Sequence, residues 1–467
     1  MNPARPGVLR RRVLRDAATR SVAGNIGARL VALVCVALVT VLVARSGGAE
    51  DVGLLALMRV LPGVVGVVAA CGLPGAMGFF VAGTDATHPR LWPTIHAAML
   101  AGALVGTAVW LMVTPVIHDH LMSTTSYAVV AVTGVTVATQ LPVAVGKACL
   151  QALDDPRGSN IVTAAEEAAF VPAYLLLWVW GVRGGWLLVL SLLVADVVVA
   201  AYAWVRIGRR VHRRGAALGG RPDTALGRRM VAFGLRSQVG GILNLLNLRL
   251  DVVILGALAG PAQVGVYVVA SKYAELLRLP GLALTWVTYP NFSRRAASVA
   301  STGPVAPSVR AAPTSRAAPA APAVPAAPAA PAAPAAAPRA RRPFPTVGQL
   351  LTFGLLAGVL LAASAFIVLP AVFGEQFSAA AWPAAVISLG LVAEPAAGVA
   401  SGFLLGSGRP GLNSLVLGGG FAVTLVLDLL LIPRHGSLGA AWASAVAYLT
   451  TDVLLIHAWR RLSQERS

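Results

Sequence analysis

The chain has 467 residues, of which 57% are hydrophobic and only 12% are charged, and its mean hydropathy is +0.76. Soluble globular proteins carry about 25% charged residues, so this composition excludes a soluble domain and predicts an integral membrane protein. The apolar runs are continuous and about 20 residues long, which predicts membrane helices rather than a barrel of short alternating strands. The net charge of +19 does not indicate a nucleic-acid partner, because the arginines gather in the gaps between apolar runs, as membrane topology requires.

The N-terminal segment, residues 1–20, is rich in arginine and is followed by an apolar run near 26–43. The Arg11-Arg12 pair could indicate a twin-arginine export signal, since such signals contain two adjacent arginines. However, the apolar run is long, contains Arg29 and lacks a clear small-x-small cleavage site. We therefore expect a retained first helix whose N-terminus is cytoplasmic.

The remaining apolar runs predict eleven further spans, which makes twelve in all. They lie near 53–81, 93–114, 126–150, 160–180, 184–205, 232–257, 263–289, 347–373, 378–406, 411–432 and 437–459. With this count nearly all loop arginines fall on one side, which the positive-inside rule assigns to the cytoplasm. We therefore expect a multi-pass membrane protein with both termini cytoplasmic.

An internal repeat underlies the spans. The pairs of matching positions are Val52-Gly53 with Val264-Gly265, Arg59 with Lys272, Trp186 with Trp442, and Asp196 with Asp452. The spacing between matches grows across a tract of Ala and Pro that begins at Gly303. Without that tract the chain is two six-helix halves, which insert in the same orientation because six is even.

These features divide the chain into seven segments. We expect a basic cytoplasmic N-terminus (1–20), an N-terminal six-helix half (21–206), a basic cytoplasmic loop (207–228), the first two helices of the C-terminal half (229–295), a Pro/Ala-rich disordered cytoplasmic loop (296–345), the last four helices (346–460) and a C-terminal tail (461–467). The Pro/Ala loop cannot form a stable helix. It is a docking strip for a Pro-binding partner or, as we favour, a tolerated insertion.

Charged and amide side chains inside the predicted spans mark a central cavity between the halves, since such groups are costly in a bilayer unless they face a cavity or a partner. Cations in a cavity suit an anionic substrate, and arginine in particular suits a diphosphate. The alternative is that Arg29 and Lys272 snorkel to the membrane surface and that the others form structural ion pairs. The candidate substrate-binding residues are Asn25, Arg29, Arg59, Lys147, Arg249, Asp251 and Lys272.

Glu166 and Glu167 are the candidate ion-coupling residues, because a carboxylate within a span can carry H⁺ or Na⁺. Adjacent helical residues point about 100° apart, so we expect only one of them to face the cavity squarely. Asp196 and Asp452 are interpreted as caps or interfacial residues near helix ends. Gly72-Leu73-Pro74 and Leu279-Pro280-Gly281 are expected to break their helices. Nothing in the sequence indicates a catalytic residue, a metal ligand or a cofactor.

The most specific stretch is the hairpin 240–292, which carries Asn247, Arg249 and Asp251 and then the motif V-G-x-Y-x-x-A-x-K at 264–272. A second motif, L-x-G-x-G-R-P-x-x-N, ends at Asn413, and L-I-P-x-x-G-x-x-G-A-A ends at Ala441. In these motifs the chain resembles the polysaccharide flippases of the multidrug/oligosaccharidyl-lipid/polysaccharide (MOP) superfamily.

The resemblance implies an all-α integral membrane protein with twelve transmembrane helices, arranged as two six-helix halves around a central cavity in the MATE-like fold. It also implies a flippase, not an enzyme, that moves an undecaprenyl-diphosphate-linked oligosaccharide to the outer leaflet. The implied partners are that lipid-linked oligosaccharide with its anionic diphosphate head, membrane lipids and proteins of polysaccharide assembly. The long Ala/Pro loop departs from the family's usual pattern.

Two other functions stay open. A cation-coupled multidrug exporter of the same superfamily would have the same helices but a cavity richer in carboxylates than in cations. A non-transporting scaffold of polysaccharide assembly would leave the cavity charges unexplained. A membrane glycosyltransferase is disfavoured, because such enzymes need a large external loop with an acidic catalytic residue and the external loops here are short.

Overall fold

A computed structural model describes residues 6–83, 88–215, 219–278, 346–406 and 409–464. Within these residues every regular element is a helix. The Pro/Ala-rich loop expected at 296–345 and the helix break expected at 279–281 lie outside the described residues, so both stay predictions.

The first half of the chain folds into eight helices. They are α1 (Pro6–Ala69), α2 (Leu73–Gly83), α3 (Leu91–Leu121), α4 (Tyr127–Thr133), α5 (Val135–Ala152), α6 (Pro156–Ala168), α7 (Phe170–Val179) and α8 (Gly184–Arg213). The break between α1 and α2 falls at Cys71 (φ 47°) and Gly72 (φ 70°), where the Gly-Leu-Pro motif predicted it. The backbone of Gly72 lies against Gly234 of the following half, leaving no room there for a Cβ.

The second half contains one very long helix, a broken helix pair and two further long helices. The elements are α9 (Thr224–Ala274), the short 3₁₀ helix η1 (Glu275–Leu277), α11 (Val347–Phe373), η2 (Glu375–Ala380), α12 (Ala381–Gly390), α13 (Glu394–Gly406) and α14 (Pro410–Gln464). Local capping defines several starts: Thr346 and Gln349 form a capping box at α11, and Asp223 caps α9.

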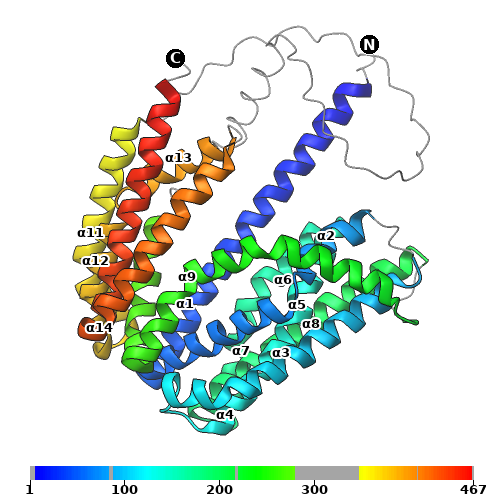
Figure 1. The fold of residues 1–467 in the computed structure, drawn as a ribbon, viewed down its shortest axis with the longest axis horizontal. Coiled ribbons are helices and arrows are strands. Elements are labelled where there is room, and N and C mark those ends of the chain that lie inside the picture. Colours follow the sequence, from blue (N-terminus) through cyan, green and yellow to red (C-terminus); the bar gives the residue numbers. More distant parts are fainter. Residues whose placement is uncertain (1–5, 84–87, 216–218, 279–345, 407–408, 465–467) are drawn as a thin grey trace.

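Among the described residues, eight helices are long and apolar enough to cross a membrane, or nine if the bent pair Glu375–Gly390 and Glu394–Leu404 counts as one span. Three of the long helices contain a glycine with a positive φ, namely Gly48 (81°) in α1, Gly260 (81°) in α9 and Gly436 (54°) in α14. Figure 1 shows α1 running away from the N-terminus and turning back. The count of twelve spans stays a prediction.

The molecule has two lobes. The N-terminal lobe comprises the part of α1 after Gly48 together with α2–α8, and the C-terminal lobe comprises the part of α9 after Gly260 together with α11–α14. The lobes spread apart toward the end that carries both chain termini and meet at the opposite end (Figure 1). We call that opposite end the closed end. The largest apolar core cluster spans both lobes and includes Leu57, Leu255, Tyr267 and Phe377.

At the closed end the two Val-Gly motifs of the sequence repeat pack against each other. A Cβ on Gly53 would lie 1.7 Å from the carbonyl oxygen of Pro261, and a Cβ on Gly265 would lie 1.8 Å from that of Ala49. Both positions therefore require glycine, because only a hydrogen atom fits between the two backbones. Further hydrogen bonds join the part of α1 just before Gly48 to the C-terminal lobe: Arg45 donates to backbone oxygens of α11, and the Gln376 side chain donates to the Ala44 carbonyl at 3.0 Å.

Candidate functional site

A cavity of about 460 Å³ lies between the lobes. Residues of α1, α5, α6 and α8 line it on one side, and residues of α9, η1 and α14 line it on the other. Its charged lining residues are Arg59, Glu166, Glu167, Asp196, Arg249, Asp251, Lys272, Glu275 and Arg278. A cavity of this size matches sites that hold small molecules.

On the N-terminal side two ion pairs involve the adjacent glutamates of α6. Arg59 of α1 donates from Nη1 to Oε2 of Glu167 at 2.8 Å, and the same guanidinium lies 5.3 Å from the centre of the Phe170 ring. Lys147 of α5 donates from Nζ to Oε2 of Glu166 at 2.6 Å. Both glutamates line the cavity. From the sequence we expected only one to face it squarely, because adjacent helical residues point about 100° apart. The reason that both do so is that a cation lies near each of the two glutamates: Arg59 of α1 pairs with Glu167, and Lys147 of α5 pairs with Glu166.

Asp196 also lines the cavity, where the Thr139 hydroxyl donates to its Oδ2 at 2.8 Å. This differs from the sequence interpretation of Asp196 as a cap near a helix end. Because α8 continues to Arg213, well beyond the predicted end of the span, Asp196 lies in the middle of its helix. Asp452, its partner in the repeat, is likewise buried within α14 rather than at a helix end.

On the C-terminal side the polar groups are again paired. Lys272 donates to Glu275 at 2.9 Å, one turn further along the chain. The Tyr267 hydroxyl donates to Oδ2 of Asp251 at 2.5 Å and lies 2.9 Å from the hydroxyl of Ser444. These contacts join the two parts of α9 to α14.

Arg278 is a lining residue that is not among the predicted substrate-binding residues. Its guanidinium lies 4.5 Å from the Tyr448 ring centre and its Nε lies 3.9 Å from a carboxylate oxygen of Glu394. The sequence does contain a signal for it. One face of a helix is formed by residues spaced three or four apart, and this spacing links Tyr267, Ser271, Glu275 and Arg278.

The structure brings four of the seven predicted substrate-binding residues to the cavity wall: Arg59, Arg249, Asp251 and Lys272. Lys147 reaches it indirectly, through its ion pair with the lining residue Glu166. Arg29 is exposed on α1 and is not among the lining residues. The side chain of Asn25 lies outside the described residues.

The cavity is balanced in charge rather than cationic, contrary to what the sequence suggested. Five lining carboxylates face four lining cations, and three of these cations have a carboxylate within 4 Å. Pairing keeps isolated charges out of a membrane interior, where they are costly. Arg249 is the exception: it is exposed and has no ion pair with any described residue.

Asp428 of α14 is fully buried, and neither of its carboxylate oxygens has a hydrogen-bond partner among the described residues. Buried polar groups in folded proteins are nearly always hydrogen-bonded. Such an unsatisfied carboxylate therefore marks a place where a proton or a cation would be stabilising.

Comparison with known proteins gives a family and a fold. The profile of a family described as "Polysaccharide biosynthesis protein" matches residues 18–295, which is more than half of the chain. No curated protein sequence matches the chain.

Three solved structures show the fold. The lipid II flippase MurJ in its inward closed conformation is 11% identical, with a TM-score of 0.62 over 95% of this chain and 87% of that one. An inward-facing multidrug resistance MATE transporter of the MOP superfamily is 13% identical, with a TM-score of 0.60 over 92% of this chain and 98% of that one. The MATE multidrug transporter DinF-BH is 14% identical, with a TM-score of 0.56 over 98% of this chain and 96% of that one. The chain therefore has the all-helical fold of two lobes around a cavity that these transporters share.

Proposed function

Because the chain belongs to the polysaccharide biosynthesis protein family, we propose that it is a flippase that moves an undecaprenyl-diphosphate-linked oligosaccharide across the bacterial plasma membrane. In this proposal it works by alternating access, and both termini and the basic loop at 207–228 lie in the cytoplasm. The solved structures that it resembles are flippases and transporters rather than enzymes.

The observation that carries the proposal is the cavity between two lobes, which meet at the closed end and spread apart toward the other end. Membrane transporters alternate access by moving two such bundles around a site between them. The ion pairs Arg59–Glu167, Lys147–Glu166 and Lys272–Glu275 are each formed within one lobe. The lobes can therefore separate and close without breaking these pairs.

A lining of mixed charge suits a substrate that is both a diphosphate and a glycan. Arg249 is available to an anion, and a diphosphate oxygen can replace Glu275 at Lys272, because phosphate is a strong acceptor for cationic donors. The carboxylates freed or left in the wall accept hydrogen bonds from sugar hydroxyls. The lipid tail stays in the bilayer, since burying it in a charged cavity would be unfavourable.

Coupling to an ion is proposed for Glu166 or Glu167, whose carboxylates lie in the cavity wall next to Lys147 and Arg59. Asp428 is a further candidate, because its buried carboxylate has no described partner. Binding of H⁺ or of Na⁺ at Glu166 or Glu167 would change the charge balance of the cavity between the two states of the transport cycle.

Multidrug export is the second candidate function, and the carboxylates of the cavity favour it. A cationic drug would pair with Glu166, Glu167 or Asp196, as lipophilic cations pair with acidic side chains in low-dielectric sites. The nearby cations Arg59 and Lys147 would oppose such binding, so we rank this function below glycolipid transport.

The test is flipping in proteoliposomes of a fluorescent undecaprenyl-diphosphate oligosaccharide, measured by protection of the fluorophore from an external quencher. Wild type is compared with Arg249→Gln and with Arg434→Gln, a matched control in which an exposed arginine outside the cavity is changed. We expect flipping by wild type and the control, and at least tenfold slower flipping by Arg249→Gln, since a charge-assisted hydrogen bond contributes about 1.5–3 kcal/mol.

The proposal is wrong if wild type does not flip the glycolipid under either an H⁺ or a Na⁺ gradient. Extrusion of a cationic dye in the same vesicles, lost on Glu166→Gln, would then favour the multidrug exporter. If wild type transports neither molecule yet copurifies with polysaccharide-assembly proteins, the scaffold function is favoured.

A further inference from the structure

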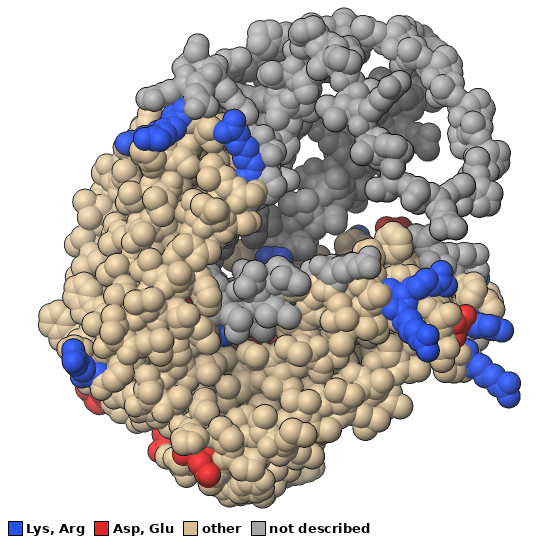
Figure 2. All heavy atoms as spheres, viewed as in Figure 1, with Lys and Arg blue, Asp and Glu red and all other residues tan. Residues whose placement is uncertain are grey.

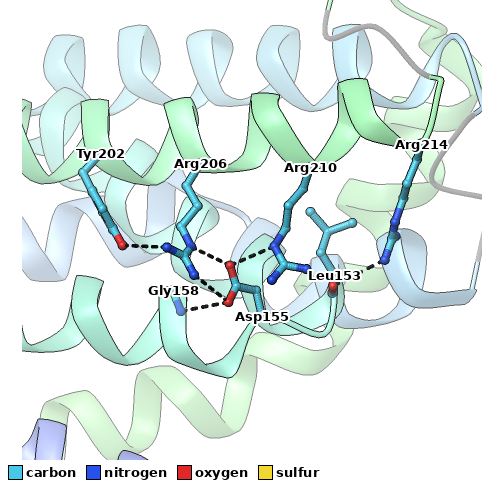
Figure 3. Close-up of polar contacts among 7 residues, drawn as sticks. All are labelled: Leu153, Asp155, Gly158, Tyr202, Arg206, Arg210 and Arg214. Carbon is cyan, nitrogen blue, oxygen red and sulfur yellow. Dashed lines mark hydrogen bonds and ion pairs between the residues drawn. The ribbon is translucent and has the colours of Figure 1, made fainter.

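Asp155, between α5 and α6, is a buried carboxylate that holds two arginines of α8 (Figure 3). Its side chain is 3% exposed. Arg206 donates to both of its oxygens, from Nε at 2.5 Å and from Nη2 at 3.0 Å, and Arg210 donates from Nε at 2.9 Å. The backbone N–H of Gly158 also donates to it at 3.0 Å, so Asp155 caps α6. One carboxylate thus fixes two guanidinium groups and neutralises only one.

Asp155 stays charged under all ordinary conditions. Burial alone would raise its pKa, but the hydrogen bonds from Arg206 and Gly158 and the positive charges of Arg206 and Arg210 outweigh burial and lower the pKa to about 2. The two arginines are themselves about one-third exposed. They therefore present fixed positive charge at the surface.

Around this pair the end of the N-terminal lobe is strongly basic. In the described residues of 88–92, 153–158 and 202–230, ten arginines face three aspartates. Figure 2 shows Lys and Arg gathered over this end of the lobe. We call the arginines at and beside the end of α8 the α8 platform: Arg157, Arg206, Arg209, Arg210, Arg213 and Arg214.

The α8 platform continues a surface that faces lipid. Val194, Val197, Val198 and Val205 are between 40% and 57% exposed and form one stripe along α8. At the same helical spacing the stripe continues into Arg209, which is exposed. An apolar stripe that ends in arginine is the pattern of a helix that leaves the hydrocarbon core and meets the headgroup layer.

We propose that the α8 platform binds the phosphate headgroups of anionic membrane phospholipids. Guanidinium groups bind phosphate through paired N–H donors, and arginines already held by Asp155 lose little freedom on binding. The platform adjoins the lipid-facing stripe of α8, so the ligand that reaches it along the membrane is a lipid of that leaflet. All of its residues belong to the N-terminal lobe, so it keeps its arrangement while the lobes move.

The test is a lipid titration of the full-length protein in detergent, with bound lipid counted by native mass spectrometry. The probes are phosphatidylglycerol, which is anionic, and phosphatidylcholine, which carries no net charge. The platform variant changes three exposed arginines that make no hydrogen bond or ion pair with a described residue, and the control variant changes three exposed arginines elsewhere, so that the net charge of the two variants is equal. The platform variant is Arg157→Gln/Arg209→Gln/Arg213→Gln, and the control is Arg409→Gln/Arg434→Gln/Arg461→Gln.

We expect wild type and the control to bind phosphatidylglycerol equally and more tightly than phosphatidylcholine. We expect the platform variant to bind it about fivefold more weakly for each arginine removed. Its affinity should also depend less on salt than that of wild type, because three of the six platform arginines no longer contribute. Thermal unfolding of the variant checks that it is folded, and Arg209→Gln alone gives the same test at about fivefold if the triple change destabilises the protein.

The proposal is overturned if both variants lose affinity equally, because the effect would then be one of net charge. Equal binding of the two lipids by wild type also overturns it. If equimolar undecaprenyl diphosphate displaces phosphatidylglycerol from wild type, the platform belongs to the transported lipid instead. None of these readouts depends on transport, so the outcome is independent of the proposed flippase activity.

Discussion

The contact between Gly53 and Pro261 predicts that a single methyl group added at position 53 will separate the two lobes at the closed end. A Cβ at position 53 would lie 1.7 Å from the Pro261 carbonyl oxygen and 2.9 Å from the backbone nitrogen of Gly265. Since such contacts are not found below 3.0 Å, Gly53→Ala must move the two helices apart by more than about 1 Å. Both neighbours are backbone atoms, so no side-chain rotation can relieve the clash.

Overpacking of this kind costs about 1–3 kcal/mol. In the proposed alternating-access cycle, this cost falls on the state in which the lobes meet at the closed end. It shifts the ratio of the two states by roughly fivefold to 150-fold. We therefore expect Gly53→Ala to populate a form that is open at this end. The matched control is Gly63→Ala in the same helix, where a Cβ meets no atom within 4 Å.

The measurement is the distance between two spin labels placed across the closed end, at Asp119→Cys in the N-terminal lobe and Arg434→Cys in the C-terminal lobe. Both positions are exposed, and the native cysteines 35, 71 and 149 are replaced first. We expect a longer distance to gain population in Gly53→Ala and not in Gly63→Ala. An unchanged distance distribution in Gly53→Ala, with normal thermal stability, would refute the reasoning that this contact holds the end closed.

Four further results are expected. Asp155→Asn keeps a good capping residue for α6 but loses the two ion pairs with Arg206 and Arg210, whose side chains are about one-third exposed. It should therefore destabilise the protein by about 1–2 kcal/mol. The measurement is thermal unfolding, with Asp154→Asn as the control. Because the pKa of Asp155 is lowered to about 2, its contribution is full above about pH 4 and is lost as the pH falls toward 2, so the difference between wild type and Asp155→Asn should shrink over that range. Glu166→Gln leaves Lys147 without its ion pair and should lower the thermal stability of the protein. The double variant Glu166→Gln/Lys147→Met should regain much of that stability, which a double-mutant cycle measures. Asp428→Asn breaks no hydrogen bond with a described residue, so it should keep thermal stability, and a loss of transport in it would indicate an ionic role.

The all-helical membrane architecture was predictable from the lengths of the apolar runs, whereas the MATE-like arrangement was implied by the resemblance of the motifs at 240–292 and 404–441 to a known family. The repeated Val-Gly motif predicted that Gly53 and Gly265 are equivalent positions, and the structure adds that the two motifs lie in direct contact. The helix bounds were less predictable: α8 extends to Arg213, since arginines with long apolar stems can continue a helix into the headgroup layer. That extension placed Asp196 in the middle of a helix and in the cavity wall.

The candidate site was predictable by residue type but not by partner. Arg59, Arg249, Asp251 and Lys272 could be expected in the cavity, because charges within spans need a polar surrounding. The sequence could not show that Glu167 lies at Arg59, since these residues are far apart in the chain and meet only when α6 packs on α1. The balance of charge in the cavity is a result of such tertiary pairing.

The ion pairs at the cavity, Arg59–Glu167, Lys147–Glu166 and Lys272–Glu275, each lie within one lobe, and this has a consequence for how the chain can vary. A change of sign at Lys147 can be compensated by a change at Glu166, and one at Lys272 by a change at Glu275, without any adjustment in the other half. The closed-end contact is different, because the backbones at Gly53 and Gly265 approach so closely that neither position has room for a Cβ. Each half can therefore diverge in its cavity chemistry as a separate module. A chimera that joins halves from two related chains should assemble when the paired glycines are kept.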